Sequence, residues 1–139
     1  MNHKTGVVFD TNIFISAIIF GGNPRTCLEL AKNKEIELYT SRKILVELSL
    51  KLRLKFRWKE DDIHNVIEGI LVFTNLVTPK RVINLIKNDP KDNIILECAQ
   101  ESKTDYIISG DKKHLLCLNE FKNIPIITAK LFLDRYYKN

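Results

Sequence analysis

The chain has 139 residues, 45% of them hydrophobic and 28% charged, which is enough to bury a core and excludes a disordered or fibrous protein. No stretch approaches the ~18 uninterrupted apolar residues of a membrane span, so we expect one cytoplasmic domain over residues 1–139 and no membrane partner. The net charge of +5 is compatible with a polyanionic partner such as RNA, although charge alone does not establish one.

Short β-rich apolar runs alternate with helical patterns along the chain. The patterns predict extended segments at 6–10, 36–40, 76–79, 106–109 and 125–128, and helices at 13–34, 41–54, 60–73, 90–102, 112–118 and 129–137. Such alternation is typical of an α/β domain with a central, mostly parallel β-sheet flanked by helices. Open parallel sheets bind ligands outside the carboxyl ends of their strands, so functional residues are expected at that edge.

Two acids follow predicted strands directly. Asp10 closes the first strand, and Asp111 follows the strand at 106–109 after Ser109 and a glycine. Either carboxylate is well suited to cap the helix that comes next, and for each acid taken alone a cap is the simpler interpretation. Two strands that end in the same chemistry nevertheless point two carboxylates at one edge of one sheet, which capping does not require.

The other two acids lie on predicted helices. Asp92 comes three residues after Asp89, the expected helix cap, and shares a helix face with apolar residues that should turn inward. Glu47 lies at the edge of an apolar stripe, where a surface ion pair with Lys51, four residues later, is the alternative. Four inward carboxylates would repel one another unless cations lay between them, and hard oxygen ligands favour Mg²⁺ or Mn²⁺.

Other metal ligands are disfavoured. The three cysteines, Cys27, Cys98 and Cys117, lack CxxC spacing and occur in apolar contexts, so we interpret them as small buried hydrophobic residues. The three histidines are scattered without ligand-like spacing, which argues against a histidine metal site or a histidine base. Any metal bound by this chain is therefore expected to have carboxylate ligands.

The segments Val7-Val8-Phe9-Asp10-Thr11-Asn12, Asp89-Pro90-Lys91-Asp92-Asn93 and Ser109-Gly110-Asp111-Lys112, with Glu47 between them, resemble the PIN-domain family over essentially the whole chain. The most similar members are small prokaryotic toxins of the VapC group. The resemblance implies a Mg²⁺- or Mn²⁺-dependent ribonuclease with Asp10, Glu47, Asp92 and Asp111 as its catalytic and metal-binding acids. It further implies a protein antitoxin as partner, and supporting hydrogen bonds from Asn12 and Ser109.

One position departs from the family pattern. Many relatives carry a further acid two residues after the fourth, where this chain has Lys113. A second metal ion would therefore be weakly held or dependent on substrate, and Asp89, which could replace the missing acid, is better explained as a helix cap.

The segment from Lys51 to Lys59 alternates cations with apolar residues, and its cations Arg53, Lys55 and Arg57 are candidates for RNA binding. Phe56 and Trp58 could stack on bases, but packing into the core is the simpler explanation for aromatic residues in a small domain. The same region, with the helix at 60–73, could equally be where an antitoxin or a second protomer docks, so a homodimer remains open.

Two other functions compete with the nuclease. A PIN domain that has lost catalysis would bind RNA or act as a scaffold, and the presence of all four acids argues against it. A phosphatase of similar α/β layout would use Asp10 as its nucleophile. The haloacid type of phosphatase requires a second acid two residues later, where this chain has Asn12.

Overall fold

The computed structural model describes residues 3–83, 92–111 and 115–138. The elements in chain order are β1 (Gly6–Phe9), α1 (Thr11–Ile15), the π-helical turn η1 (Ser16–Phe20), α2 (Gly22–Lys32), β2 (Glu37–Ser41), α3 (Arg42–Leu54), α4 (Glu60–Phe73), β3 (Thr74–Val77), α5 (Asn93–Ser102), β4 (Tyr106–Ile108), α6 (Leu115–Leu118), β5 (Glu120–Phe121), β6 (Ile124–Ile127) and α7 (Ala129–Lys138).

The strands form one six-stranded sheet in the order β3-β2-β1-β4-β6-β5. All neighbouring strands pair in parallel except β5 and β6, which form a short antiparallel hairpin. The chain leaves β1 toward β2 and β3 on one side, and later enters β4 on the other side of β1. The strand order therefore reverses between β1 and β4, the position at which open α/β sheets bind ligands.

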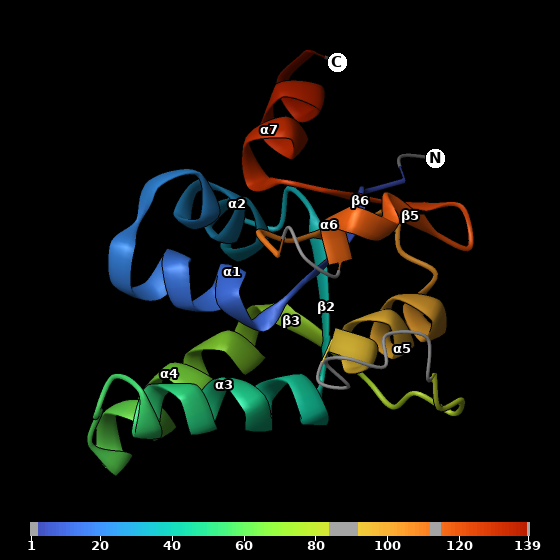
Figure 1. The fold of residues 1–139 in the computed structure, drawn as a ribbon. Coiled ribbons are helices and arrows are strands. Elements are labelled where there is room, and N and C mark those ends of the chain that lie inside the picture. The colour runs from blue at the N-terminus through green and yellow to red at the C-terminus, as the bar shows by residue number, and fades with distance from the viewer. Residues whose placement is uncertain (1–2, 84–91, 112–114, 139) are drawn as a thin grey trace.

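Helices cover both faces of this sheet. Helices α1 to α4 lie together on one side of the sheet and α5 on the other, as Figure 1 shows. Helix α5 packs across β1, β2, β3 and β4, and α7 returns to pack against α2. The central strands β1 and β4 are almost entirely buried, with Val7, Val8, Phe9, Ile107 and Ile108 all at 0% exposure. The predicted α/β sandwich is confirmed.

The predicted helix at 13–34 is wrong in one respect, because it is interrupted. Helix α1 ends at Ile15, a π-helical turn follows, and α2 begins at Gly22 after its cap residue Gly21. Both glycines have positive φ, +87° and +67°, a backbone conformation that L side chains rarely adopt. The hydrophobic periodicity of the sequence continues through this break, so the periodicity did not reveal the break.

Smaller differences concern one strand, the first residues of two helices, and the cysteines. The strand β5 was not predicted, and the first residues of the predicted helices at 90–102 and 112–118, with Asp89 and Lys113, lie outside the described residues. Cys27 and Cys98 are buried as predicted, and burial raises the pKa of each thiol to about 12. Cys117 is exposed, which corrects the prediction for that residue.

Within the described part of the chain, no helix combines the length and apolarity that crossing a bilayer requires.

Candidate functional site

Asp10 is buried where β1 meets α1. Its Oδ1 accepts a hydrogen bond from the Ile13 backbone N–H at 2.9 Å, which caps α1, and its Oδ2 accepts one from the Ser109 hydroxyl at 2.5 Å. Burial raises the pKa of Asp10, and the hydrogen bonds from Ser109 and Ile13 oppose that rise. The carboxylate therefore caps a helix and also faces the end of the neighbouring strand.

Ser109 and Asp111 follow the adjacent strand β4. Phe9 of β1 lies in register with Ile108 of β4, which brings the residues after each strand together. The Ser109 hydroxyl oxygen accepts the Asp111 backbone N–H at 2.9 Å while donating to Asp10, so one buried side chain joins the Asp10 carboxylate to the backbone of Asp111. The charge of Asp111 also contributes to the raised pKa of Asp10. The two acids thus meet where the strand order reverses.

Glu47 reaches the same region from α3, which packs against α1. It is only 8% exposed, and its Oε1 lies 3.7 Å from Nζ of Lys51, one helical turn later. Lys51 also donates a hydrogen bond to Asn12 Oδ1 at 3.1 Å, and its charge opposes the rise in the pKa of Asp10. The ion pair that sequence offered as the alternative for Glu47 does form, but with a buried carboxylate and with a lysine whose charge also acts on Asp10, the acid that follows β1.

Asp92 occupies the cap position of α5, and its Oδ2 atom is buried. Its helix packs against β1 and β2 and ends just before β4, so the first turn of α5 lies toward the carboxyl ends of the strands. The face predicted to turn inward does so, since Ile95, Leu96 and Ala99 are each at most 1% exposed. Helix α5, which begins after Asp92, lies on the other side of the sheet from α3, which carries Glu47, and the two helices are in contact.

The described acids do not form a closed ligand sphere. Among residues 3–83, 92–111 and 115–138, no three His, Cys, Asp or Glu side chains are gathered closely enough to hold a metal ion. What the structure brings together is Asp10 with Asp111 through Ser109, and Glu47 with Asn12 through Lys51. The donors are carboxylate and amide oxygens, which fit Mg²⁺ or Mn²⁺ in chemical kind.

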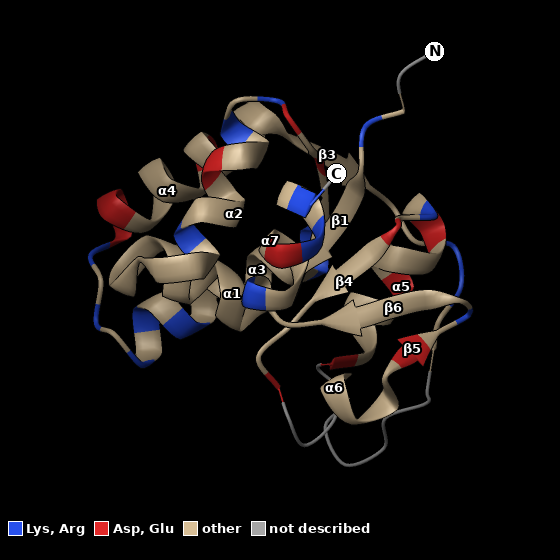
Figure 2. Cartoon of the chain, turned by 90° about the horizontal axis from the view of Figure 1, so that it is seen from above, with Lys and Arg blue, Asp and Glu red and all other residues tan. Residues whose placement is uncertain are grey.

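The candidate RNA-binding cations lie at the end of α3 and in the turn to α4. Figure 2 shows this basic end directly followed by the acidic first turn of α4. Arg53 is engaged there with Glu60, with Nε to Oε2 at 2.5 Å and Nη2 to Oε1 at 2.8 Å. Phe56 and Trp58 are half-buried and pack against the core, as the simpler interpretation predicted. Lys55 and Arg57 are exposed.

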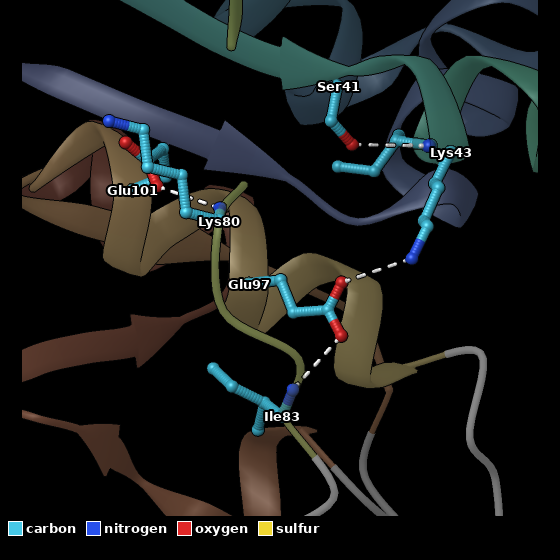
Figure 3. A network of polar contacts seen from close by, with 7 residues as sticks. Ser41, Lys43, Lys80, Ile83, Glu97 and Glu101 are labelled. Atoms are coloured by element: carbon cyan, nitrogen blue, oxygen red, sulfur yellow. Dashed lines mark hydrogen bonds and ion pairs between the residues drawn. The ribbon is translucent and has the colours of Figure 1, made fainter. Parts of the chain in front are cut away.

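Glu97, a carboxylate on α5 that is only 5% exposed, was not predicted from the sequence. Its Oε1 lies 3.7 Å from Lys43 Nζ on α3, and its Oε2 accepts the Ile83 backbone N–H at 3.1 Å (Figure 3). One turn later, Glu101 accepts the Lys80 backbone N–H at 3.0 Å (Figure 3). Glu97 therefore connects α5, α3 and the chain after β3. The available signal was an acid within an otherwise apolar stretch, Ile94 to Ala99.

Comparison with known proteins places this arrangement in a family. A family model described as a PIN domain matches residues 6–113. The chain is 34% identical to the uncharacterized protein MJ1680 of Methanocaldococcus jannaschii over an alignment 148 residues long. The alignment covers 97% of this chain and 94% of that protein.

Two solved structures share the fold. VapBC2 from Rickettsia felis, bound to a DNA fragment from their promoter, matches with a TM-score of 0.64 and 16% identity, over 88% of this chain and 97% of that chain. PAE2754 from Pyrobaculum aerophilum matches with a TM-score of 0.64 and 12% identity, over 98% of this chain and 91% of that chain. At these identities the likeness concerns the fold alone.

Proposed function

Because the chain belongs to the PIN-domain family, whose members are generally nucleases, we propose that it is a Mg²⁺- or Mn²⁺-dependent endoribonuclease acting in the cytoplasm. Asp10, Glu47, Asp92 and Asp111 are its metal-binding and catalytic acids, and residues 1–139 act as one domain. The observation that carries this proposal is the meeting of Asp10 and Asp111 through Ser109 at the reversal of strand order.

Contacts within the described part of the chain position three of these four acids. Asp10 is oriented by its cap and by Ser109, which leaves lone pairs on both carboxylate oxygens for further coordination. Asp111 is held by its own backbone N–H on Ser109, and Glu47 enters from α3 across α1. A divalent ion held by these acids would supply an ionised water for attack on a phosphodiester and would offset charge on the leaving oxygen.

The test is cleavage of structured RNA by the purified chain. We expect activity only with Mg²⁺ or Mn²⁺, products with a 5′-phosphate and a 3′-hydroxyl, and a large loss of activity in Asp10→Asn and Asp92→Asn. Asparagine can still cap α1, but its amide nitrogen cannot accept the Ser109 hydroxyl, so a melting curve of Asp10→Asn is needed to separate lost charge from lost stability. Asp134→Asn, an exposed acid on α7 paired with Lys130, is the matched control and should stay active.

Several outcomes would contradict the proposed nuclease function. Cyclic-phosphate ends, or cleavage that survives EDTA and both substitutions, would exclude these carboxylates as the catalytic site. Binding of RNA without cleavage under every metal condition would favour a non-catalytic PIN domain. Hydrolysis of phosphate monoesters with no effect on RNA would favour the phosphatase with Asp10 as nucleophile.

A second part of the proposal is a protein antitoxin that covers the groove between α3, α4 and β3. This groove, of about 460 Å³, is lined by apolar side chains that include Leu50, Leu71 and Leu76, which are 41%, 38% and 55% exposed. Contiguous apolar surface of this kind marks interaction sites in soluble proteins. The antitoxin is favoured as occupant because a structure of the same fold is the VapBC2 complex.

Co-expression with the adjacent gene tests this partner. Leu50→Glu should weaken the complex strongly, whereas Leu54→Glu, a change on the same helix at a 73% exposed residue outside the groove, should not. Equal binding by both variants would remove the groove from the proposal. A dimer of the chain alone that Leu50→Glu dissociates would instead assign the groove to a second copy.

A further inference from the structure

Lys51 has an unusual position for a helix-surface lysine. Its ammonium lies between two elements that are far apart in sequence, 3.1 Å from Asn12 Oδ1 after β1 and 3.7 Å from Glu47 Oε1 on α3. Its side chain is 30% exposed and that of Glu47 only 10%. An ordinary i,i+4 pair on a helix surface joins two solvated groups and involves no third residue.

Lys51 lies beside two residues of the proposed metal site. Glu47 is one of the proposed metal-binding acids, and Asn12 follows Asp10 by two residues. The charge of Lys51 also acts on Asp10 and opposes the effect of burial on the pKa of that acid. A single ammonium therefore interacts with two of the acids to which the proposed function assigns a divalent ion.

We propose that Lys51 is the internal counter-cation of this site, which stabilises the acids when no metal is bound and competes with the divalent ion for them. Carboxylates that share a partly buried site repel one another, and a nearby ammonium offsets that repulsion. A divalent ion requires the same oxygens, and two cations a few ångströms apart repel each other. The lysine side chain has a flexible four-carbon stem, so its ammonium can turn to solvent as the ion enters.

The inference rests on the proposed function in one respect, which is that the acids bind a divalent ion. It predicts that this chain holds its metal more weakly than the same acids would without Lys51. It also predicts that the metal-free protein gains stability from Lys51 and that the metal-bound protein does not.

Calorimetric titration with Mn²⁺ and thermal unfolding, with and without Mn²⁺, test the inference without any activity assay. Lys51→Met keeps the length of the side chain and removes its charge. We expect this variant to bind Mn²⁺ about tenfold more tightly than the unmodified chain. Its melting temperature should be lower without metal, and the difference should vanish at saturating Mn²⁺.

Two controls separate a local effect from general electrostatics. Lys51→Arg keeps the charge and should restore the original affinity and melting temperature. Lys55→Met removes the same charge one turn later, at an exposed position, and should change neither quantity. An unchanged or weakened Mn²⁺ affinity in Lys51→Met would overturn the inference while leaving the metal site intact. No Mn²⁺ binding by the unmodified chain would overturn both this inference and the proposed function.

Discussion

Ser109 shows how a small side chain can organise charged ones. Its hydroxyl donates to Asp10 Oδ2 and accepts the Asp111 N–H, and the residue is completely buried. A hydroxyl is suited to this task because it is both donor and acceptor. A buried carboxylate oxygen that loses such a donor bears the full cost of its desolvation. One oxygen atom therefore contacts both the Asp10 carboxylate and the backbone of Asp111.

Replacing Ser109 by alanine should destabilise the protein by about 1–3 kcal/mol, because buried polar groups on both sides lose their partner. Mn²⁺ affinity should fall by about 10- to 100-fold, as expected when a residue that orients metal ligands is removed. Urea unfolding and calorimetric titration measure the two effects. Ser102→Ala removes a hydroxyl that bonds only helix carbonyls and should leave both nearly unchanged. Equal stability and equal Mn²⁺ affinity in the two variants would show that Ser109 does not position the metal-binding acids.

At the scale of elements, sequence patterns predicted what amphipathic periodicity can encode. Helix α4 has the predicted bounds, and α3 begins one residue later than predicted, because Ser41 is its cap and accepts the Ile44 N–H. The break between α1 and α2 was not predictable from that periodicity. It depends on backbone conformations that only glycine adopts easily, and the pair Gly21-Gly22 was the available signal.

Two glycine substitutions should therefore have opposite effects. Gly21→Ala places a side chain at φ +87° and ψ −137° and should destabilise the protein by about 1–3 kcal/mol. Gly69→Ala lies inside α4, where an added Cβ meets nothing within 4 Å, and should stabilise it by about 0.5–1 kcal/mol. Chemical denaturation of both variants measures the difference. Destabilisation of similar size in both would contradict the assigned backbone conformations.

Glu97 also acts between elements, because its carboxylate connects α5, α3 and the chain after β3. Glu97→Ala leaves the Ile83 N–H and Lys43 without this carboxylate and should lower the free energy of unfolding by about 1–3 kcal/mol. Glu101→Ala removes the same group one turn later, where its bond to the Lys80 N–H is exposed, and should cost less. Equal decreases in urea unfolding would make Glu97 an ordinary surface acid.

At the scale of the whole molecule, the reversal of strand order explains why the candidate site lies where it does. Alternating strands and helices predicted the edge, and the residues that close β1 and β4 predicted the meeting of Asp10 and Asp111. Sequence offered the Lys51–Glu47 pair within α3, but it could not predict that Lys51 also donates to Asn12 or that Arg53 pairs with Glu60, because Asn12 and Glu60 belong to other elements. Side-chain partners across elements require the fold.

This division of the cations leads to a prediction for RNA binding by the whole molecule. The net charge of +5 implies counterion release on binding, so RNA affinity measured in EDTA should fall steeply with salt.

Arg53 is already neutralised by Glu60, whereas Lys55 and Arg57 are exposed in the turn that follows α3. Lys55→Gln with Arg57→Gln should flatten the slope of log affinity against log salt by about 0.7 for each RNA phosphate that the protein no longer neutralises. Arg53→Gln removes a charge of the same sign and should flatten it much less, because Arg53 is paired with Glu60 and neutralises no phosphate. An equal change for all three cations, or an unchanged slope in the double variant, would place the RNA path on another part of the surface.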